Sequence, residues 1–397
     1  MSDVADASVV GNAAISSAKI PCALCGAEVH VISKHLETTH PEVSLEQYQE
    51  RFPAAPLLSD IAKQHIEKAQ AKARADSAVS VMGDFSVKKR AMHEVFQLPP
   101  VKSSMSSIGN QPIPISIFES PAAIADLVPE VDEHYVFNTE LLKTVLLGLE
   151  INENVYLWGH AGVGKTTVIE QVCAYTKRPW FRVQHTRNME EAHVVGQWTV
   201  KSGETVFELG PLPYAMKHGL VYVADEYDCG APGVIALYQA VLEGKALVIK
   251  DADRANRIIK PHPMFRFVAT GNTNGTGDET GLYAGTLQGN AANYERFGIV
   301  EEVLYPEEKV EIAVVMAKGK VKQDIAKQLV DFARRIREAF SGGTIGLPIS
   351  TRALVKAANL GRRTASMNKG LQLAYVNRLT RIDQEAARGY IDRAGIQ

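Results

Sequence analysis

One segment of the chain has the residues needed to bind a chain of phosphates. Residues 159–166 match the pattern G-x4-G-K-T. The glycines let backbone N–H groups surround phosphate oxygens, the lysine reaches the outer phosphates, and the threonine hydroxyl is a ligand for Mg²⁺. An apolar run (VYLWG) precedes the segment and an amphipathic run (TTVIEQVCAYTK) follows it, which favours a phosphate loop over an incidental glycine turn. The predicted nucleotide-binding residues are Gly159, His160, Ala161, Gly162, Val163, Gly164, Lys165, Thr166 and Thr167.

Two carboxylates follow another apolar run about sixty residues later. Residues 220–224 (LVYVA) end in Asp225 and Glu226. An aspartate at such a strand end helps to hold Mg²⁺ in phosphate-loop enzymes, and a neighbouring glutamate can orient or deprotonate an attacking water. A solvated acidic turn is the alternative, and the preceding phosphate loop makes it the weaker one. Thr166 and Asp225 are therefore the predicted magnesium ligands.

Three further polar residues could act on the outermost phosphate. Asn272 follows the apolar run FRFVAT, although asparagine in a Gly-Asn pair is often only a turn residue. Arg296 precedes the run GIVEEVLY and could be a finger supplied to a neighbouring subunit, or else form an ordinary surface salt bridge. Arg352 begins a predicted helix near the C-terminus, where it could reach the phosphate or only pair with a carboxylate.

A different chemistry is indicated near the N-terminus. Cys22, Cys25, His35 and His40 offer two sulfurs and two nitrogens, the set that zinc binds tetrahedrally. Both histidines lie in a predicted helix end (ISKHLETTH), which places their rings on nearly one face. The alternative is chance clustering in a solvated loop.

The composition is that of an ordinary soluble globular protein. The chain has 397 residues, 46% of them hydrophobic, and a formal net charge of -2, which excludes a polybasic coat. No apolar run reaches the ~18 residues of a membrane span, and the acidic start has no signal-peptide pattern. Four cysteines in this length do not make a disulfide scaffold. These observations predict a cytoplasmic protein with no membrane contact.

Changes in composition and hydrophobic pattern along the sequence predict five regions. Residues 1–18 are expected to form a disordered tail, residues 19–56 the zinc-binding module, and residues 57–130 a helix followed by a proline-rich linker. In residues 131–305, short apolar runs alternate with helical stretches, a pattern typical of a parallel sheet with crossover helices. The apolar runs are residues 155–159, 180–183, 220–225, 265–272 and 299–305. Hairpins are expected at 194–209 and 246–260, and helices throughout residues 306–397.

The region from about 131 to 360 resembles the AAA+ ATPases of the MoxR group and, within them, the CobS family of cobaltochelatase ATPase subunits. The residues that carry the resemblance are DEYD at 225–228, the stretch IKPHPMFRFVATGNTNGTGDETGLYAGTLQ at 259–288, and YERFGIV at 294–300. Such a run of matches is far more specific than the phosphate loop alone.

The resemblance implies an α/β fold with a five-stranded parallel αβα sheet and a helical lid, assembled as a homo-hexameric ring. Residues 159–166 would be Walker A, and Asp225 and Glu226 Walker B with Glu226 as the catalytic base. Asn272 would be sensor 1, Arg296 the arginine finger, and Arg352 sensor 2. The implied cofactors are ATP and Mg²⁺, and Zn²⁺ is added by the N-terminal cluster.

The segment PCALCGAEVHVISKHLETTHPEVSLEQYQERFP resembles the Ros/MucR-type zinc finger, a family that binds DNA. A DNA-reading surface needs lysines and arginines to neutralise phosphates. Residues 19–53 contain three basic and five acidic side chains, so their net charge is -2. This charge favours a finger that docks a protein over one that reads DNA.

These patterns together predict a ring-forming ATPase that remodels or activates a partner protein. The resemblance implies that this partner is a von Willebrand-type protein or a chelatase subunit. Three alternatives stay open. They are a DNA-associated motor recruited through the finger, an ATP-dependent assembly switch, and a genuine cobaltochelatase subunit. The fusion of a finger to this motor also suggests a recruited protein, for example from a phage or other mobile element.

Overall fold

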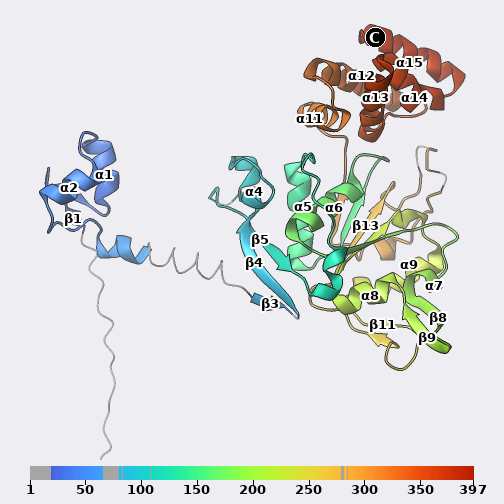
Figure 1. Cartoon of the computed structure of the whole chain (residues 1–397), viewed down its shortest axis with the longest axis horizontal. Helices are drawn as coiled ribbons and strands as arrows, with labels where there is room; N and C mark the ends of the chain where they lie inside the picture. Colours follow the sequence, from blue (N-terminus) through green and yellow to red (C-terminus); the bar gives the residue numbers. More distant parts are fainter. Residues whose placement is uncertain (1–18, 66–79, 83, 108, 279–280, 284) are drawn as a thin grey trace, which may run out of the picture. The chain divides into compact units, whose positions relative to one another are not determined.

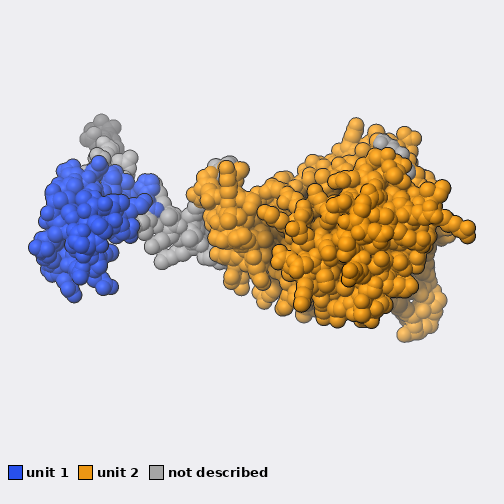
Figure 2. All heavy atoms as spheres, turned by 90° about the horizontal axis from the view of Figure 1, so that it is seen from above, with its two compact units in different colours: residues 1–78 blue, residues 79–397 orange. Residues whose placement is uncertain are grey.

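The computed structural model describes residues 19–65, 80–82, 84–107, 109–278, 281–283 and 285–397. The predicted tail, residues 1–18, and most of the helix expected at 57–80 lie outside these ranges, while residues 60–65 are helical. The chain divides into two compact units, residues 1–78 and 79–397, which Figure 2 shows in different colours. Each unit is described by itself.

The first unit is a small ββαα module. A two-stranded antiparallel hairpin, β1 (Ile20–Pro21) and β2 (Glu28–Val29), precedes helices α1 (Ile32–Thr39) and α2 (Leu45–Arg51). Helix α2 begins at a reciprocal capping box, in which Ser44 and Gln47 each bind the other's backbone N–H. The core of this module is small and consists of Cys22, Ile32, Leu36 and Tyr48.

A parallel sheet of five strands forms the centre of the second unit, which confirms the predicted fold class. The strand order is β14-β6-β13-β10-β7, and every pairing is parallel. Strand β6, which precedes the phosphate loop, therefore lies between β14 and β13. Each strand lies in one of the predicted apolar runs. The bounds are β6 (Val155–Trp158), β7 (Trp180–Gln184), β10 (Val221–Asp225), β13 (Arg266–Gly271) and β14 (Ile299–Glu302).

Alternation along the strands divides the core into two layers, one on each face of the sheet (Figure 1). Val221 and Val223 of β10 face the layer with α5 (Thr139–Ile151) and α6 (Lys165–Thr176). Tyr222 and Ala224 face the opposite layer, with α8 (Pro211–His218) and α9 (Pro232–Leu242). Because both faces are covered, the inner strands β6, β10 and β13 are buried and read mainly as apolar runs in the sequence.

Residues 80–130 differ from the predicted linker. Strands β3 (Ser80–Met82), β4 (Phe85–Ala91) and β5 (Pro114–Glu119) form an antiparallel sheet, which belongs to the second unit. The prolines that suggested a linker flank these strands, and Pro114 is the first residue of β5, a position where the missing N–H is tolerated. Short elements follow the strands: α4 (Met92–Val95), η1 (Lys102–Ser104) and η2 (Ala122–Leu127).

Both predicted hairpins are confirmed. Strands β8 (Gly196–Lys201) and β9 (Glu204–Leu209) pair antiparallel, as do β11 (Leu247–Val248) and β12 (Ile258–Ile259). The indole N–H of Trp198 donates to the Asp251 carbonyl at 2.8 Å and so connects the two hairpins. The remaining short elements of this region are α7 (Ala192–Val195), η3 (Tyr227–Cys229) and α10 (Ala291–Tyr294).

The C-terminal part is helical, as predicted, and has its own core. It contains α11 (Glu308–Gly319), α12 (Gln323–Ser341), α13 (Thr351–Thr364), α14 (Met367–Ala374), η4 (Val376–Arg378) and α15 (Arg381–Arg393). A buried ion pair joins α11 to α12, where both oxygens of Glu311 accept from Arg337 at 2.6 and 2.7 Å. Among the described residues, no helix has both the length and the apolar character that crossing a membrane requires.

Candidate functional site

The phosphate-loop residues form a turn between β6 and α6. Gly164 caps the helix with a φ of 105°, a conformation that glycine adopts without steric cost. Gly162 also has a positive φ, 80°, and a Cβ placed there would lie 2.7 Å from the Cβ of Ser350. The loop is therefore shaped by glycine and touches the residue that caps α13. Helix α6 directs its N-terminal N–H groups into this turn, an arrangement suited to an anion.

Lys165 lies in the first turn of α6 and is almost completely buried. Its ammonium group donates to the carbonyls of Gly159 at 2.7 Å and His160 at 3.0 Å, and to Asn272 Oδ1 at 3.2 Å. Burial lowers the pKa of Lys165 to about 8, although nearby carboxylates, Asp228 first among them, oppose this shift. The amine is thus a poorly solvated cation that an incoming anion would stabilise.

Asp225, at the end of β10, is fully hydrogen-bonded. Its Oδ1 accepts from the hydroxyls of Thr166, at 2.8 Å, and Thr270. Its Oδ2 accepts from the guanidinium of Arg182, with Nε at 2.8 Å. Burial alone would raise the pKa of Asp225, but the bonds from the two threonines and Arg182 hold it below its usual value. The carboxylate is therefore ionised and lies beside the Thr166 hydroxyl.

Glu226 has an unusual backbone conformation for a residue with a side chain. Its φ is 54° and its ψ 42°, in the left-handed region that non-glycine residues seldom occupy. Its carboxylate accepts from the Gln184 side chain at 2.8 Å. Gln184 ends β7 and is the register partner of Asp225 on β10. The turn and the amide together fix the direction of the Glu226 side chain.

Asp228 fixes the loop that carries Asn272. One oxygen, Oδ2, accepts from the backbone N–H of Asn272 at 2.8 Å and from both the N–H and the hydroxyl of Thr273 at 2.9 and 3.1 Å. Within the described residues, the other oxygen is buried without a hydrogen-bond partner. Burial raises the pKa of Asp228. The residue thereby connects the carboxylate turn to the amide that contacts Lys165.

A pocket of about 730 Å³ opens beside the phosphate loop. Its walls come from the segment before α5, from the phosphate loop, and from helices α11 and α13. Gly162, Gly164, Thr167 and Arg352 all line it. The Cβ of Arg352 lies 3.6 Å from a Cβ placed on Gly162, so the structure brings Arg352 to the loop. This volume is typical of small-molecule sites.

Tyr283 covers the other side of the loop. Its hydroxyl accepts from the Ala161 N–H at 3.1 Å and lies 3.0 Å from His160 Nδ1. The His160 ring is also stacked on Tyr305, with ring centroids 5.9 Å apart. One of the loop's N–H groups is therefore already engaged by a side chain in this state.

Arg296 does not join the group around Lys165. Its guanidinium pairs with Glu243, with Nε and Nη2 at 2.9 and 2.8 Å from Oε1, and its Nη1 donates to the Ala292 carbonyl at 2.5 Å. Its backbone carbonyl accepts from Asn154 at 3.0 Å. The structure thus brings together Lys165, Thr166, Asp225, Glu226, Asn272 and Arg352, and leaves Arg296 in a separate ion pair.

The donors of this group fit ATP with Mg²⁺. The hydroxyl and carboxylate oxygens of Thr166 and Asp225 are the hard ligands that Mg²⁺ prefers. The buried ammonium and the helix N-terminus suit the phosphates. The adjacent pocket offers room for the remainder of a nucleotide.

The N-terminal cluster fits zinc. One ligand atom from each of Cys22, Cys25, His35 and His40 lies within 4.8 Å of all the others. Cys25 Sγ is 3.2 Å from His35 Nε2, and His40 Nε2 is buried with no partner among the described residues. A buried ring nitrogen without a hydrogen-bond partner is costly unless something binds it. Tetrahedral coordination with zinc–sulfur bonds of about 2.3 Å requires this kind of spacing.

Sequence reasoning missed several residues of the site. Arg182 and Gln184 lie on β7, where the run WFRV was recognised only as a strand. Their signal was available, because the carboxyl ends of neighbouring parallel strands meet at one edge of the sheet. Asp228 stood in the quoted motif DEYD without a role, and its bonds to residues 272 and 273 span more than forty positions. Tyr283 likewise depends on a loop path that no local pattern gives.

Comparison with known families matches two parts of the chain. Residues 154–286 match the AAA domain of the dynein-related subfamily. Residues 311–394 match the CbbQ/NirQ/NorQ C-terminal domain. The first match contains the phosphate loop, Asp225, Glu226 and Asn272, and the second contains the helices α12–α15.

Among curated proteins, the chain is 34% identical over 277 residues to the aerobic cobaltochelatase subunit CobS of Sinorhizobium sp, which covers 67% of this chain and 82% of that protein. It is 28% identical over 240 residues to the protein NorQ of Paracoccus denitrificans, covering 60% and 84%. It is 26% identical over 336 residues to the mouse von Willebrand factor A domain-containing protein 8, covering 82% of this chain but 17% of that protein.

Among solved structures, the RuvB Holliday junction branch migration motor of Thermotoga maritima is 15% identical to this chain. The match covers 67% of this chain and 72% of that one, with a TM-score of 0.39.

Proposed function

Because this chain belongs to the MoxR-type AAA+ ATPases and hydrolyses ATP, we propose that it is a ring motor that uses this hydrolysis to remodel or activate a partner protein. The observation that supports the proposal most is the convergence of Lys165, Asp225, Glu226 and Asn272 on one side of the phosphate loop. A helical C-terminal region that touches this loop through Ser350 can follow the state of the nucleotide.

In this proposal, the chain's own residues divide the work. Lys165 and the loop N–H groups bind the phosphates, and Thr166 and Asp225 hold Mg²⁺, which supplies positive charge to the outer phosphates. Glu226, aimed by Gln184, accepts a proton from the attacking water. Asp228 keeps Asn272 in place beside Lys165, and Arg352 reaches the phosphates from α13.

Stimulation of turnover is the test of the remodelling role. ATP hydrolysis by the full chain is measured alone, with single-stranded and duplex DNA, and with a purified protein that binds it in the presence of ATP. Stimulation by the protein, and none by DNA, is the expected result. Stimulation by DNA alone would favour the DNA-associated motor. Single turnover followed by a stable ring, unaffected by any protein, would favour the assembly switch.

The arginine finger gives a prediction of its own. We propose that Arg296 acts in trans, on the nucleotide of the neighbouring subunit of a homo-hexamer. The variant Arg296→Ala should bind ATP normally but hydrolyse it at least ~10³-fold more slowly, the usual effect of removing such a finger. Binding is measured with a fluorescent nucleotide and turnover by phosphate release.

The variant Glu243→Gln is the matched control, since it weakens the same ion pair and keeps the arginine. It should stay within a few-fold of wild type. An Arg296→Ala protein that assembles and retains full turnover would show that the residue forms only a surface salt bridge.

For the first unit, we propose a zinc-bound module that docks a protein. Its acidic balance argues against phosphate neutralisation. The purified chain should contain one zinc ion, and Cys25→Ser should release it, because a structural site needs all four ligands. The zinc content of the purified protein is measured by elemental analysis and with a colorimetric chelator.

Cys229→Ser is the control for zinc content, because Cys229 lies in the second unit and is not part of the cluster. It should keep its zinc. Turnover in the absence of a partner should change little in the Cys25→Ser variant, since the nucleotide site lies wholly in the other unit. Zinc retained at wild-type content in Cys25→Ser would disprove the cluster as the binding site.

A further inference from the structure

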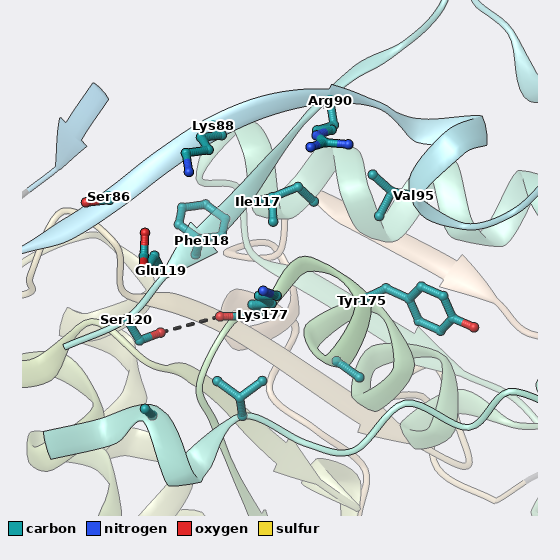
Figure 3. Close-up of a pocket in the computed structure, with 13 residues that line it drawn as sticks. Ser86, Lys88, Arg90, Val95, Ile117, Phe118, Glu119, Ser120, Tyr175 and Lys177 are labelled. Atoms are coloured by element: carbon teal, nitrogen blue, oxygen red, sulfur yellow. Dashed lines mark hydrogen bonds between the residues drawn. The ribbon is translucent and has the colours of Figure 1, made fainter. Parts of the chain in front are cut away.

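A groove of about 750 Å³ lies at the far end of α6 from the phosphate loop (Figure 3). It is bounded by strands β4 and β5, by η2 and by the last turn of α6. Since α6 has 12 residues, its two ends are separated by about 18 Å at ~1.5 Å per residue. The groove is therefore distinct from the nucleotide pocket.

Three basic side chains converge on this groove. Lys88 and Arg90 extend toward it from β4, and Lys177, at the C-terminal end of α6, lies on its opposite side (Figure 3). All three residues are exposed. Within the part of the chain that the structure describes, none of the three charged groups makes a hydrogen bond or an ion pair. The lining has a single carboxylate, Glu119, so the local charge is positive.

The cations next to these three in the sequence, by contrast, have a carboxylate partner. Lys89 points to the other face of β4, where it bonds Glu150 at 2.6 Å and Ser116 at 2.7 Å. Arg178, next to Lys177, bonds the same Glu150 at 3.2 Å. The half-buried carboxylate thus neutralises the cations that face inward. Those that face the groove are left to repel one another unless an anion binds.

The other groups at the groove suit phosphate. Ser86 and Ser120 also line it, with the Ser120 hydroxyl donating to the Lys177 carbonyl at 3.4 Å, and serine hydroxyls often contact phosphate oxygens. Lys88 and Arg90 are two residues apart on one strand, so their Cα atoms are separated by about 6.8 Å at ~3.4 Å per residue. That separation lets the two side chains contact different phosphate groups of one chain. Guanidinium and ammonium groups are the usual partners of phosphate.

We propose that this groove binds a chain of phosphate groups, supplied either by a free polyphosphate or by the backbone of a single-stranded nucleic acid. The proposal does not depend on the remodelling function, since it concerns binding and not turnover.

The test is binding of two probes to the full chain, with excess Mg·ADP present to fill the nucleotide site. Fluorescein-labelled oligo(dT) is followed by anisotropy, and inorganic tripolyphosphate is used as the competitor and, in calorimetry, as a ligand. The charge-reversal variant combines Lys88→Glu, Arg90→Glu and Lys177→Glu. Its matched control places glutamate at three exposed lysines of the helical region, Lys309, Lys322 and Lys327.

We expect the groove variant to bind oligo(dT) at least ~10-fold more weakly than wild type. The slope of log K against log salt should become less steep by about 2, since each of the three lost phosphate contacts contributes ~0.7 for single strands. The control should lose much less. Tripolyphosphate that binds and displaces the oligonucleotide would assign a free phosphate chain, and binding of oligo(dT) alone would assign nucleic acid. Lack of binding by wild type to both probes, or an equal loss in the control, would overturn the proposal. The single variant Lys177→Ala, expected to lose about threefold, covers the case in which the triple variant does not fold.

Discussion

The variant Glu226→Gln is expected to bind ATP as tightly as wild type and to hydrolyse it at least ~100-fold more slowly, because general-base catalysis contributes about 10²–10⁴-fold. Glutamine has the same shape as glutamate but cannot accept the proton of the attacking water. Its amide can still contact Gln184, so the left-handed turn at residue 226 should persist. Single-turnover phosphate release and the retention of labelled ATP on the protein measure the two effects.

Two companion variants separate a lost base from a disturbed turn. Glu204→Gln changes an exposed carboxylate on β9 and should leave turnover unchanged. Gln184→Ala removes the amide that aims Glu226 while keeping the carboxylate, so turnover should fall less than in Glu226→Gln. Wild-type turnover in Glu226→Gln would remove this residue from the role of base.

The variant Lys165→Ala is expected to remove ATP binding at ordinary concentrations. Loss of one partner from a buried, hydrogen-bonded charge pair costs about 2–5 kcal/mol, or roughly 30-fold to several thousand-fold in affinity. Isothermal titration with a non-hydrolysable nucleotide measures the loss. Lys327→Ala, at an exposed lysine of α12, is the control and should bind as wild type does. Tight binding retained by Lys165→Ala would contradict the assignment of the phosphate loop.

The same residue gives a pH dependence with a definite sign. Burial lowers the pKa of Lys165 to about 8 in the free protein, and the negative phosphates of ATP must raise this pKa in the complex. Below pH ~8 the amine is already protonated, so affinity should be constant there. Above pH ~8 binding must take up a proton, and affinity should fall by up to about tenfold per pH unit until the pKa of the complex is reached.

Lys165→Arg tests the cause, because arginine stays protonated throughout this range. Whatever its absolute affinity, its binding should not decline between pH 8 and 9. If the ATP affinity of the wild type does not change between pH 8 and 9, the amine of Lys165 stays protonated in the free protein over this range, and its pKa is not lowered as described.

The sheet could be predicted from the sequence because its three inner strands, β6, β10 and β13, are buried on both faces and its two edge strands begin with apolar residues. The residues at the strand ends followed from the same reasoning, since Asp225, Asn272 and the phosphate loop all lie at the carboxyl edge. The roles assigned to them stay predictions. What could not be predicted is how donors pair across strands. The position of Arg182 near the carboxyl edge could be inferred from its strand, but nothing local indicates that its guanidinium bonds Asp225.

The strands at residues 85–91 and 114–119 show a second limit. Prolines around residues 99–114 indicated an extended linker, and all of them lie in irregular segments except Pro114, which begins β5. Residues 115–119 (ISIFE), however, belong to strand β5, and their side chains alternate between the two faces of a sheet. The strand that pairs with β5 lies some thirty residues earlier in the sequence. Pairing over that distance is set by packing against α5 and α6, which sequence periodicity does not report.

Gly162 connects two parts of the chain that are otherwise separate hydrophobic cores. Its missing side chain is the space into which the cap of α13 fits, with the Ser350 side chain where a Cβ would be. The phosphate loop therefore packs against the C-terminal helices at Gly162 and also at His160, whose ring meets that of Phe340 in α12 edge to face with centroids 5.7 Å apart. Because Ser350 lies so close to Gly162, we expect α13 to move when phosphate binding shifts the loop. For the proposed motor, the absence of a side chain at Gly162 therefore decides how closely a movement of the loop is coupled to a movement of α13.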